Sequence, residues 1–317
     1  MTTILQRLAI TAAEKFPLLG SKNTIGSSSS VNIMAVGASV PRGPVTATLN
    51  FYGGTEDNSA PYTWIEKPAD PSVPERNYSS VAEPVEIQDA RGRESSFTLD
   101  RDAFAILQSL PPSAEKDFLD DESIEKNYYP EVEDLLLKNV PGAKTIRIFD
   151  HTIRRTQPDS HRKPVPYAHV DQTARAVEKR IRRYYSEEEA DALLKGRYRI
   201  INVWRTLNRS PLEHFPLTYA SSASASDEDF IPVELRYPEG YRGETASIRY
   251  NPKQQWFYLS GMTSDERILL ECFDSESLKP GSKIRGQVPH SAFEDPRTRP
   301  DAEQRESIEV RALVFGP

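Results

Sequence analysis

A short motif combines two types of metal ligand in one predicted strand. The sequence has five histidines in 317 residues, and His169 is the one followed two positions later by a carboxylate, Asp171. The surrounding segment, 167-YAHVDQT, predicts a β-strand, in which residues i and i+2 project to the same face. Both side chains can therefore reach one metal ion. The motif alone carries little weight, because matches this short also arise by chance.

A third candidate ligand occurs much later in the chain. His290 lies in 286-GQVPHSAF, which also predicts a strand, and it reaches the same point if the two strands are neighbours in a barrel. Two histidines and one carboxylate on one face form the facial triad of non-haem Fe(II) oxygenases. The positions left open on the metal would let a bidentate cosubstrate and O2 bind together.

A candidate carboxylate site opens the last predicted strand, directly after the strand that carries His290. Arg305 and Ser307 share a face of this strand, and a guanidinium beside a hydroxyl suits a carboxylate. A dicarboxylate such as 2-oxoglutarate could chelate the metal at one end and place its distal carboxylate here. Arg311 is in phase with Arg305 and is the rival anchor. The alternative is that Arg305 is an ordinary surface arginine, since most arginines are exposed.

The elements that must position these residues are mostly short strands. Two segments before residue 100 have strand-forming residues bounded by turn signals, 45-VTATLNFYGG and 81-VAEPVEIQDARG. Nine more follow residue 144: 145-TIRIFDHTIRR, 167-YAHVDQT, 197-RYRIINVWRTL, 231-IPVELRY, 245-TASIRYN, 255-QWFYLSG, 267-RILLECFD, 286-GQVPHSAF and 305-RESIEVRALVF. A parallel sheet would need crossover helices between most pairs, and no fixed-period repeat indicates a propeller or solenoid. The sequence therefore predicts a mainly β protein with flanking helices, a double-stranded β-helix (jelly-roll, cupin-like) barrel.

Three helical segments accompany the strands. The segment 102-DAFAILQSL ends at a pair of prolines, 130-PEVEDLLLKNV has proline in its first turn, and residues 173–195 show three-to-four spacing of apolar side chains. We expect one elaborated domain over residues 1–317. In it, residues 1–126 supply strands, loops and a short helix that shape the substrate pocket, and residues 127–317 form the jelly-roll catalytic core.

Several motifs occur together and in order, and they resemble one enzyme family. They are 127-NYYPEVEDLL, 149-FDHTIRR, 167-YAHVDQT, 197-RYRIINVWR, 249-RYNPKQQWFYLSGM, 271-ECFDS, 289-PHSAFEDP and 305-RESIEVRALVF. The chain from about residue 127 to 315 is similar to Fe(II)/2-oxoglutarate-dependent oxygenases that include fungal hydroxylases and desaturases, a component of cephamycin methoxylation and the endoperoxide-forming enzyme of novofumigatonin biosynthesis. The resemblance implies His169, Asp171 and His290 as catalytic iron ligands, and Arg305 with Ser307 as the cosubstrate clamp.

The resemblance also implies a reaction. Fe(II), 2-oxoglutarate and O2 would be the cofactor and cosubstrates, and the substrate would be a small apolar fungal natural product such as a meroterpenoid. Hydroxylation, desaturation and endoperoxide formation are alternative outcomes that depend on how the substrate is positioned. The carboxylate of Asp171 argues against a halogenase, in which that position typically lacks one.

Two other functions remain open at this stage. One is a cupin-like metal- or ligand-binding protein without oxidase activity. The other is a zinc hydrolase that uses His169, His290 and His214, because zinc accepts three protein ligands and a water. His151 is expected to orient a ligand or to fill the core, so His151 and His214 are secondary candidates for the site. The strand residues Asn202, Trp204 and Arg205 are candidates for the pocket wall.

Charge and cysteine content limit the partners and the compartment. The formal net charge of −7 argues against a strongly basic nucleic-acid-binding protein, and the basic stretch 179-KRIRRYY is followed by the acidic 187-EEEADA. No run approaches the roughly 18 apolar residues of a membrane span. The single cysteine, Cys272, forms no internal disulfide, so we expect a cytoplasmic protein. A homodimer is a further expectation.

Overall fold

The strands form two sheets. The computed structural model describes residues 39–156 and 162–316 of the chain. The larger sheet contains, in spatial order, β1 (Val45–Thr55), β3 (Tyr78–Asp89), β11 (Trp256–Tyr258), β8 (Leu217–Ala220), β13 (His290–Ala292), β6 (His169–Val170), β10 (Arg242–Ile248), β9 (Phe230–Arg236) and β2 (Tyr62–Trp64). The smaller contains β4 (Phe104–Leu107), β12 (Arg267–Asp274), β7 (Arg197–Thr206), β14 (Glu306–Gly316) and β5 (Thr145–Arg155).

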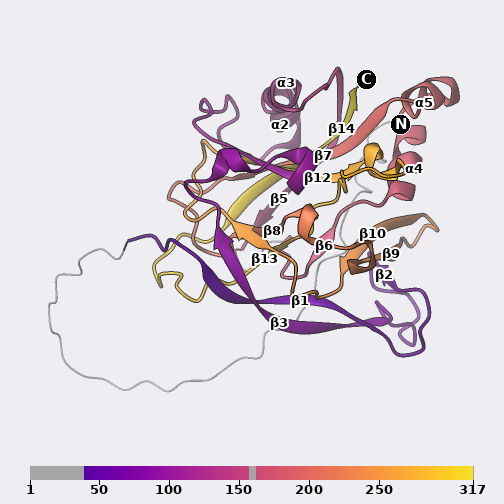
Figure 1. The fold of residues 1–317 in the computed structure, drawn as a ribbon, viewed down its shortest axis with the longest axis horizontal. Coiled ribbons are helices and arrows are strands. Elements are labelled where there is room, and N and C mark those ends of the chain that lie inside the picture. The colour runs from indigo at the N-terminus through magenta and orange to yellow at the C-terminus, as the bar shows by residue number, and fades with distance from the viewer. Residues whose placement is uncertain (1–38, 157–161, 317) are drawn as a thin grey trace, which may run out of the picture.

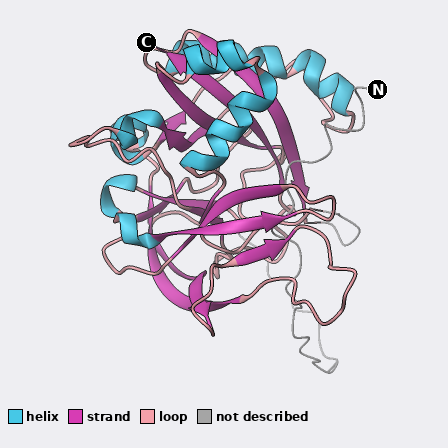
Figure 2. Ribbon diagram, turned by 90° about the vertical axis from the view of Figure 1, so that its right-hand side faces the viewer, coloured by secondary structure: helices cyan, strands magenta, loops and turns pink. Residues whose placement is uncertain are grey.

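Eight of these strands make the barrel. β8, β13, β6 and β10 are antiparallel neighbours in the larger sheet, and β12, β7, β14 and β5 are antiparallel neighbours in the smaller sheet. Figure 2 shows the strands in two layers, with helices along the outside of one layer. Two four-stranded antiparallel sheets of non-sequential strands are the arrangement of a jelly roll. The predicted fold class, mainly β with a double-stranded β-helix barrel, is confirmed.

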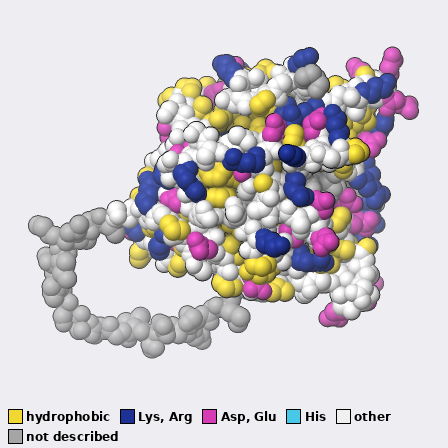
Figure 3. All heavy atoms as spheres, viewed as in Figure 1, with side chains coloured by type: hydrophobic (Ala, Val, Ile, Leu, Met, Phe, Trp, Pro, Cys, Tyr) yellow, Lys and Arg dark blue, Asp and Glu magenta, His cyan; other side chains and the backbone are white. Residues whose placement is uncertain are grey.

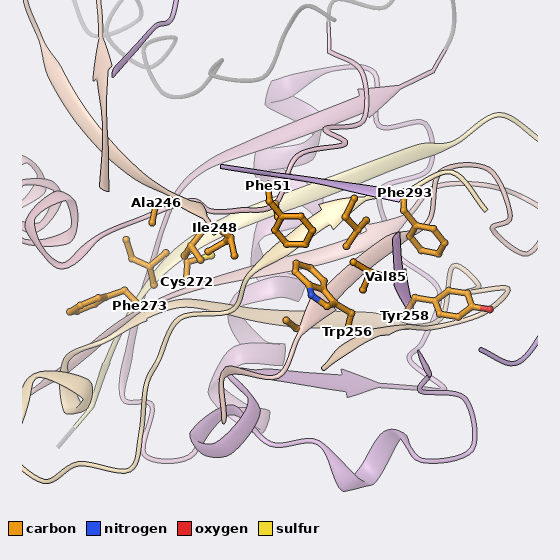
Figure 4. Close-up of a cluster of buried hydrophobic side chains, with 14 of the residues drawn as sticks. Phe51, Val85, Ala246, Ile248, Trp256, Tyr258, Cys272, Phe273 and Phe293 are labelled. Carbon is orange, nitrogen blue, oxygen red and sulfur yellow. The ribbon is translucent and has the colours of Figure 1, made fainter. Parts of the chain in front are cut away.

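The apolar core lies between the sheets. One buried cluster joins Phe51 of β1 and Trp256 of β11 to Phe273 of β12, and the first two rings meet edge to face with centroids 5.8 Å apart. Figure 4 shows these side chains together with Phe293. Because side chains of a strand alternate between faces, each sheet contributes every second residue to this layer. The inner faces of β7 and β14 can therefore hold polar side chains near the core without interrupting the packing on their outer faces.

Helices cover the outer face of the smaller sheet. α2 (Asp121–Asn127) and α3 (Tyr129–Asn139) pack through Tyr128, Val132 and Leu136 against the outward residues of β14, which include Ile308 and Val310. The helix predicted at 130-PEVEDLLLKNV is therefore confirmed as α3, with proline in its first turn. In Figure 1 these helices lie above β7, β12 and β14.

Two helix predictions need correction. The segment 102-DAFAILQSL is not a helix: α1 (Leu99–Asp102) ends at Ala103 in the left-handed region, and β4 then pairs with β12 at the sheet edge. Burial of Phe104 against the other core aromatics outweighs the helix propensity of the short segment. Residues 173–195 form two helices, α4 (Ala174–Tyr184) and α5 (Glu187–Leu193), because Ser186 starts a new helix with a capping box.

The nine strand segments after residue 144 all contain strands, although β6 has two residues and β13 three. Sequence patterns missed β2, β4 and β8. β8 is buried at each of its four positions and so has no polar–apolar alternation to detect. Among the described residues no helix is both long and apolar enough to cross a membrane.

Strands from both sides of residue 126 share both sheets. β1, β2 and β3 extend the larger sheet, and β4 pairs with β12 in the smaller one. Residues 1–38, which belong to the predicted pocket-shaping segment, lie outside the described residues. The separate roles of residues 1–126 and 127–317 therefore stay a prediction.

On the face in Figure 3, basic and acidic side chains are interspersed.

Candidate metal centre

Three predicted ligands converge at the pairing of two short strands. β13 pairs with β6 so that His290 lies opposite His169, and the imidazole centroids are 4.4 Å apart. Nε2 of His169 is 3.3 Å from Oδ1 of Asp171, and Nε2 of His290 is 3.9 Å from the same oxygen. One ligand atom from each residue lies within 4.8 Å of the other two. The three side chains predicted as ligands therefore lie together in the structure.

Backbone carbonyls fix the orientation of both imidazoles. Nδ1 of His169 donates to the carbonyl of Tyr167 at 2.7 Å, and Nδ1 of His290 donates to that of Val288 at 3.1 Å. The proton then resides on Nδ1, so Nε2 keeps its lone pair and faces Asp171. Burial, followed by the neighbouring His169, lowers the pKa of His290 to about 4. His290 is therefore neutral at physiological pH, which is the form that binds a metal.

The other oxygen of Asp171 is already occupied. Its Oδ2 accepts hydrogen bonds from Nδ2 of Asn202 at 2.8 Å and from Nε of Arg311 at 3.0 Å. Burial raises the pKa of Asp171, but the positive charge of Arg311 leads the opposing effects, and together they hold this pKa well below its usual value. Asp171 is ionised, and its Oδ1 remains directed at the two histidines. The donor set of two imidazole nitrogens and one carboxylate oxygen fits Fe(II).

Arg311 lies at the centre of a buried ionic network behind Asp171. Its Nη2 is 2.5 Å from Oε1 of Glu309, and its Nη1 is 3.3 Å from Oδ1 of Asp150 and 2.9 Å from Oγ1 of Thr152. The side chain of Arg311 is 1% exposed. Three carboxylates thus share this guanidinium, and a divalent cation beside Asp171 would offset part of the excess negative charge. The geometry is consistent with a metal at this position.

Arg305 is a buried cation in a different environment. It is 2% exposed and its guanidinium lies over the Trp204 ring, 5.1 Å from the centroid. Nε donates to Oγ of Ser307 at 3.2 Å, and Nη1 donates to the carbonyl of Phe215 at 2.8 Å. No ion pair within the described residues includes Arg305. Burial and the positive charge of Arg154 lower its pKa to about 9.

The secondary candidates lie elsewhere. His151 is on the outer side of β5, where its Nδ1 is 2.9 Å from the hydroxyl of Tyr129, so it does not orient a metal ligand. His214 is not in the metal-ligand group; its Nδ1 lies 3.4 Å from the backbone nitrogen of Arg305. The ligand set of the zinc hydrolase is therefore wrong. The prediction that Arg205 lines the pocket inside the barrel is also wrong, because Arg205 points to the outer face of β7.

The sequence analysis did not predict the ionic network around Arg311, although the sequence contains a signal for it. Polar residues occupy alternate positions of an otherwise apolar strand, at Arg305, Ser307, Glu309 and Arg311. Such alternation marks one polar face, and a buried polar face needs partners. Asn202 was expected to line the pocket, and it instead bridges Asp171 and Glu309.

Comparison with known proteins agrees with the fold and the site. The family model described as an oxidoreductase/YMDC permease-like domain matches residues 49–315. The hydroxylase/desaturase poxK of Penicillium oxalicum is 39% identical over 300 residues, which cover 87% of this chain and 92% of poxK. The fungal alpha-ketoglutarate-dependent dioxygenase phiK is 32% identical over 86% of this chain and 96% of its own length.

A solved structure shares the whole architecture. The iron and alpha-ketoglutarate-dependent endoperoxidase NvfI superposes with a TM-score of 0.76 at 25% identity, covering 87% of this chain and 99% of NvfI. The relative nvfI of Aspergillus novofumigatus is 31% identical over 78% of this chain and 88% of its own length. The jelly roll and the His-Asp-His group thus define a non-haem iron oxygenase.

More specifically, the chain belongs to the Fe(II)/2-oxoglutarate-dependent dioxygenase family that includes these fungal hydroxylase/desaturases. The enzyme uses Fe(II), 2-oxoglutarate and O2, as predicted, and the family acts on small natural products. The prediction of an oxidoreductase is confirmed, and the alternative of a binding protein without oxidase activity is set aside.

Proposed function

We propose that His169, Asp171 and His290 hold the catalytic Fe(II), and that Arg305 and Ser307 bind the distal carboxylate of 2-oxoglutarate. The observation that carries the first assignment is the convergence of two Nε2 atoms on Oδ1 of Asp171. When bound, Fe(II) activates O2 while 2-oxoglutarate is decarboxylated to succinate and CO2. The chain itself orients the ligands and the cosubstrate.

Arg311 acts on Asp171 and not on 2-oxoglutarate. Its guanidinium already serves Asp171, Glu309 and Asp150, so gripping a further carboxylate would break one of these pairs. By holding Oδ2 of Asp171, it leaves Oδ1 as the ligand atom. Positioning of this kind by residues behind the ligands is a general feature of metal sites.

Arg305 has what the distal carboxylate requires. It is a buried guanidinium with no carboxylate in an ion pair, its Ser307 neighbour supplies a hydroxyl, and the Trp204 ring supports its flat face. A buried charge without a counter-ion is costly, and a bidentate carboxylate would offset that cost. Both considerations favour Arg305 over Arg311 as the anchor.

The proposed substrate is an apolar fungal natural product, with a meroterpenoid as the leading example. The barrel interior on the side of His290 is apolar: Tyr219 pairs opposite it in β8, and Leu217 and Val288 belong to the same buried cluster. The names of relatives support oxidation at carbon, since they include hydroxylase/desaturases and an endoperoxidase. The reaction would be hydroxylation, desaturation or endoperoxide formation, begun by removal of a hydrogen atom from a C–H bond.

Three wider assignments complete the proposal. Residues 1–126 shape the substrate pocket beside the catalytic core of residues 127–317. The enzyme works in the cytoplasm, consistent with its one cysteine, the buried free thiol of Cys272. It assembles as a homodimer, which light scattering of the purified full chain would test directly.

Anaerobic reconstitution tests the iron and cosubstrate sites without the substrate. Fe(II) and 2-oxoglutarate added together should give the visible charge-transfer band of the chelate. His169→Ala and Asp171→Ala should abolish the band, whereas His214→Ala, outside the metal group, should retain it. Arg305→Ala should retain the band only at raised 2-oxoglutarate concentrations. A normal band in Asp171→Ala, or an unchanged 2-oxoglutarate requirement in Arg305→Ala, would show the assignments to be wrong.

A further inference from the structure

A cavity opens on the outer face of the smaller sheet, away from the metal centre. Its volume is about 1070 Å³, and its wall includes Phe118, Leu119, Arg205 and Leu207. None of the three proposed iron ligands lines it, and neither do Arg305 and Ser307. Trp204, which supports Arg305 inside the barrel, and Arg205, which reaches this cavity, are consecutive residues of β7 on opposite faces. The sheet therefore separates the two sites.

Arg205 is a buried cation with little to compensate its charge. It is 7% exposed, and its Nε and Nη1 have no hydrogen-bond acceptor among residues 39–156 and 162–316. Its guanidinium lies over the Phe118 ring at 5.1 Å and the Tyr128 ring at 5.7 Å from the centroids. Burial and the like charge of Arg267 lower its pKa, an effect that Tyr128 opposes. Ring contacts alone do not replace the hydrogen bonds that water would provide.

Three carboxylates of the wall are already engaged by other groups. Glu306 is 3.1 Å from Nε of Arg155, and the carboxylate of Glu115 accepts hydrogen bonds from Ser123 and Asn127. The carboxylate of Glu303 accepts hydrogen bonds from the backbone of residues 209 and 210. Within the described part of the chain, no ion pair includes Arg205. Its counter-ion is therefore not among the described residues.

We infer that this cavity binds a small organic acid, with the carboxylate on Arg205 and an apolar body against Phe118, Leu119 and Leu207. The apolar wall decides between an organic acid and a bare inorganic anion. Leu119 is 77% exposed and lies in the cavity wall, so it offers apolar surface to an occupant. This site is additional to the 2-oxoglutarate site, and its occupant does not need to reach the iron.

Calorimetric titration of the anaerobic enzyme, saturated with Fe(II) and 2-oxoglutarate, tests the inference. The probe is 4-phenylbutyrate, compared with the uncharged 4-phenylbutan-1-ol and with inorganic phosphate. We expect one saturable site for 4-phenylbutyrate and at least about tenfold weaker binding of the other two compounds. The alcohol loses a hydrogen bond to a charged group, and phosphate loses the apolar contact. Equal affinity of the acid and the alcohol, or of the acid and phosphate, would overturn the inference.

Variants locate the site. Arg205→Gln should weaken binding at least about tenfold. Arg175→Gln removes a 72% exposed arginine that is not in the cavity wall and should change nothing. Leu119→Glu places a negative charge at the exposed rim and should weaken binding severalfold, whereas Leu119→Gln loses only an apolar contact and should weaken it less. The Leu119 pair decides the outcome even if Arg205→Gln fails to fold. Unchanged affinity in Leu119→Glu or in folded Arg205→Gln would place the probe elsewhere and refute the inference.

Discussion

Replacement of Arg311 by lysine should weaken Fe(II) binding while leaving the 2-oxoglutarate requirement unchanged. A lysine keeps the charge but is a single donor group, so it cannot reach Asp171, Glu309 and Asp150 in the geometry of the guanidinium fork. Loss of a group that orients a metal ligand typically costs about 10–100-fold in metal affinity. That range corresponds to about 1.4–2.8 kcal/mol.

Arg311→Met extends the test to stability. It leaves Glu309, Asp150 and one oxygen of Asp171 buried without their shared cation, and removal of one partner from a buried ion pair costs about 3–5 kcal/mol. Since Arg311 is 1% exposed, solvent screens this interaction little. We therefore expect a lower melting temperature for Arg311→Met in the metal-free protein and a smaller decrease for Arg311→Lys.

The assay is an anaerobic Fe(II) titration at saturating 2-oxoglutarate, read from the charge-transfer band, followed by a 2-oxoglutarate titration at saturating Fe(II). Arg305→Lys is the matched control, because it should show the converse pattern: a normal Fe(II) midpoint and a raised 2-oxoglutarate midpoint. A normal Fe(II) midpoint in Arg311→Lys together with a raised 2-oxoglutarate midpoint would refute the reasoning, since Arg311 would then be the anchor.

Three further predictions concern the support of the site and the scaffold. Trp204→Leu should raise the 2-oxoglutarate concentration for half-maximal succinate release, because Arg305 loses the ring beneath its guanidinium; an unchanged value would contradict this role. Ser186→Ala should lower the free energy of unfolding by about 1 kcal/mol in denaturant titration, since it removes the α5 cap, and a Ser186→Asp control should not. Burial raises the pKa of Glu266, but hydrogen bonds, led by the one from Arg91, lower this pKa overall. The carboxylate therefore stabilises the fold at pH values above its unfolded pKa. This stabilisation is lost as the pH falls through the folded pKa. Arg91→Met should therefore reduce stability at neutral pH more than at pH 3, and equal losses at both would contradict the assignment.

The grouping of His169, Asp171 and His290 was predictable from the sequence because it depends on short-range geometry. His169 and Asp171 are two positions apart, so alternation along a strand brings them to one side. Their meeting with His290 required only that the two strands pair, which a jelly roll provides. Even so, β6 has just two residues, and its pattern alone would not have distinguished it from a loop. The chemistry of the residues, more than their periodicity, identified the segment.

The failures arose where long-range contacts decide the structure. A helix was predicted around Phe104 because the segment ends at a pair of prolines, but pairing with β12 supplies backbone partners that the segment cannot supply itself. Arg205 was placed in the barrel although it adjoins Trp204 in a strand, and consecutive strand residues face opposite sides. The three carboxylates that bind Arg311 come from two strands, β5 and β14, and from the loop after β6, a combination that no local pattern indicates.

Alternation in β14 explains how one strand can serve both ends of a cosubstrate site. Its outward residues, among them Ile308 and Val310, are apolar and pack beneath α3, which fixes the strand. Its inward face then presents Arg305 and Arg311 six positions apart, about 20 Å along an extended strand. That separation is far longer than an ion pair, so each guanidinium meets a separate group. Arg311 is committed to Asp171, and Arg305, which has no carboxylate in an ion pair within the described residues, is the guanidinium that we propose for the distal end of the dicarboxylate.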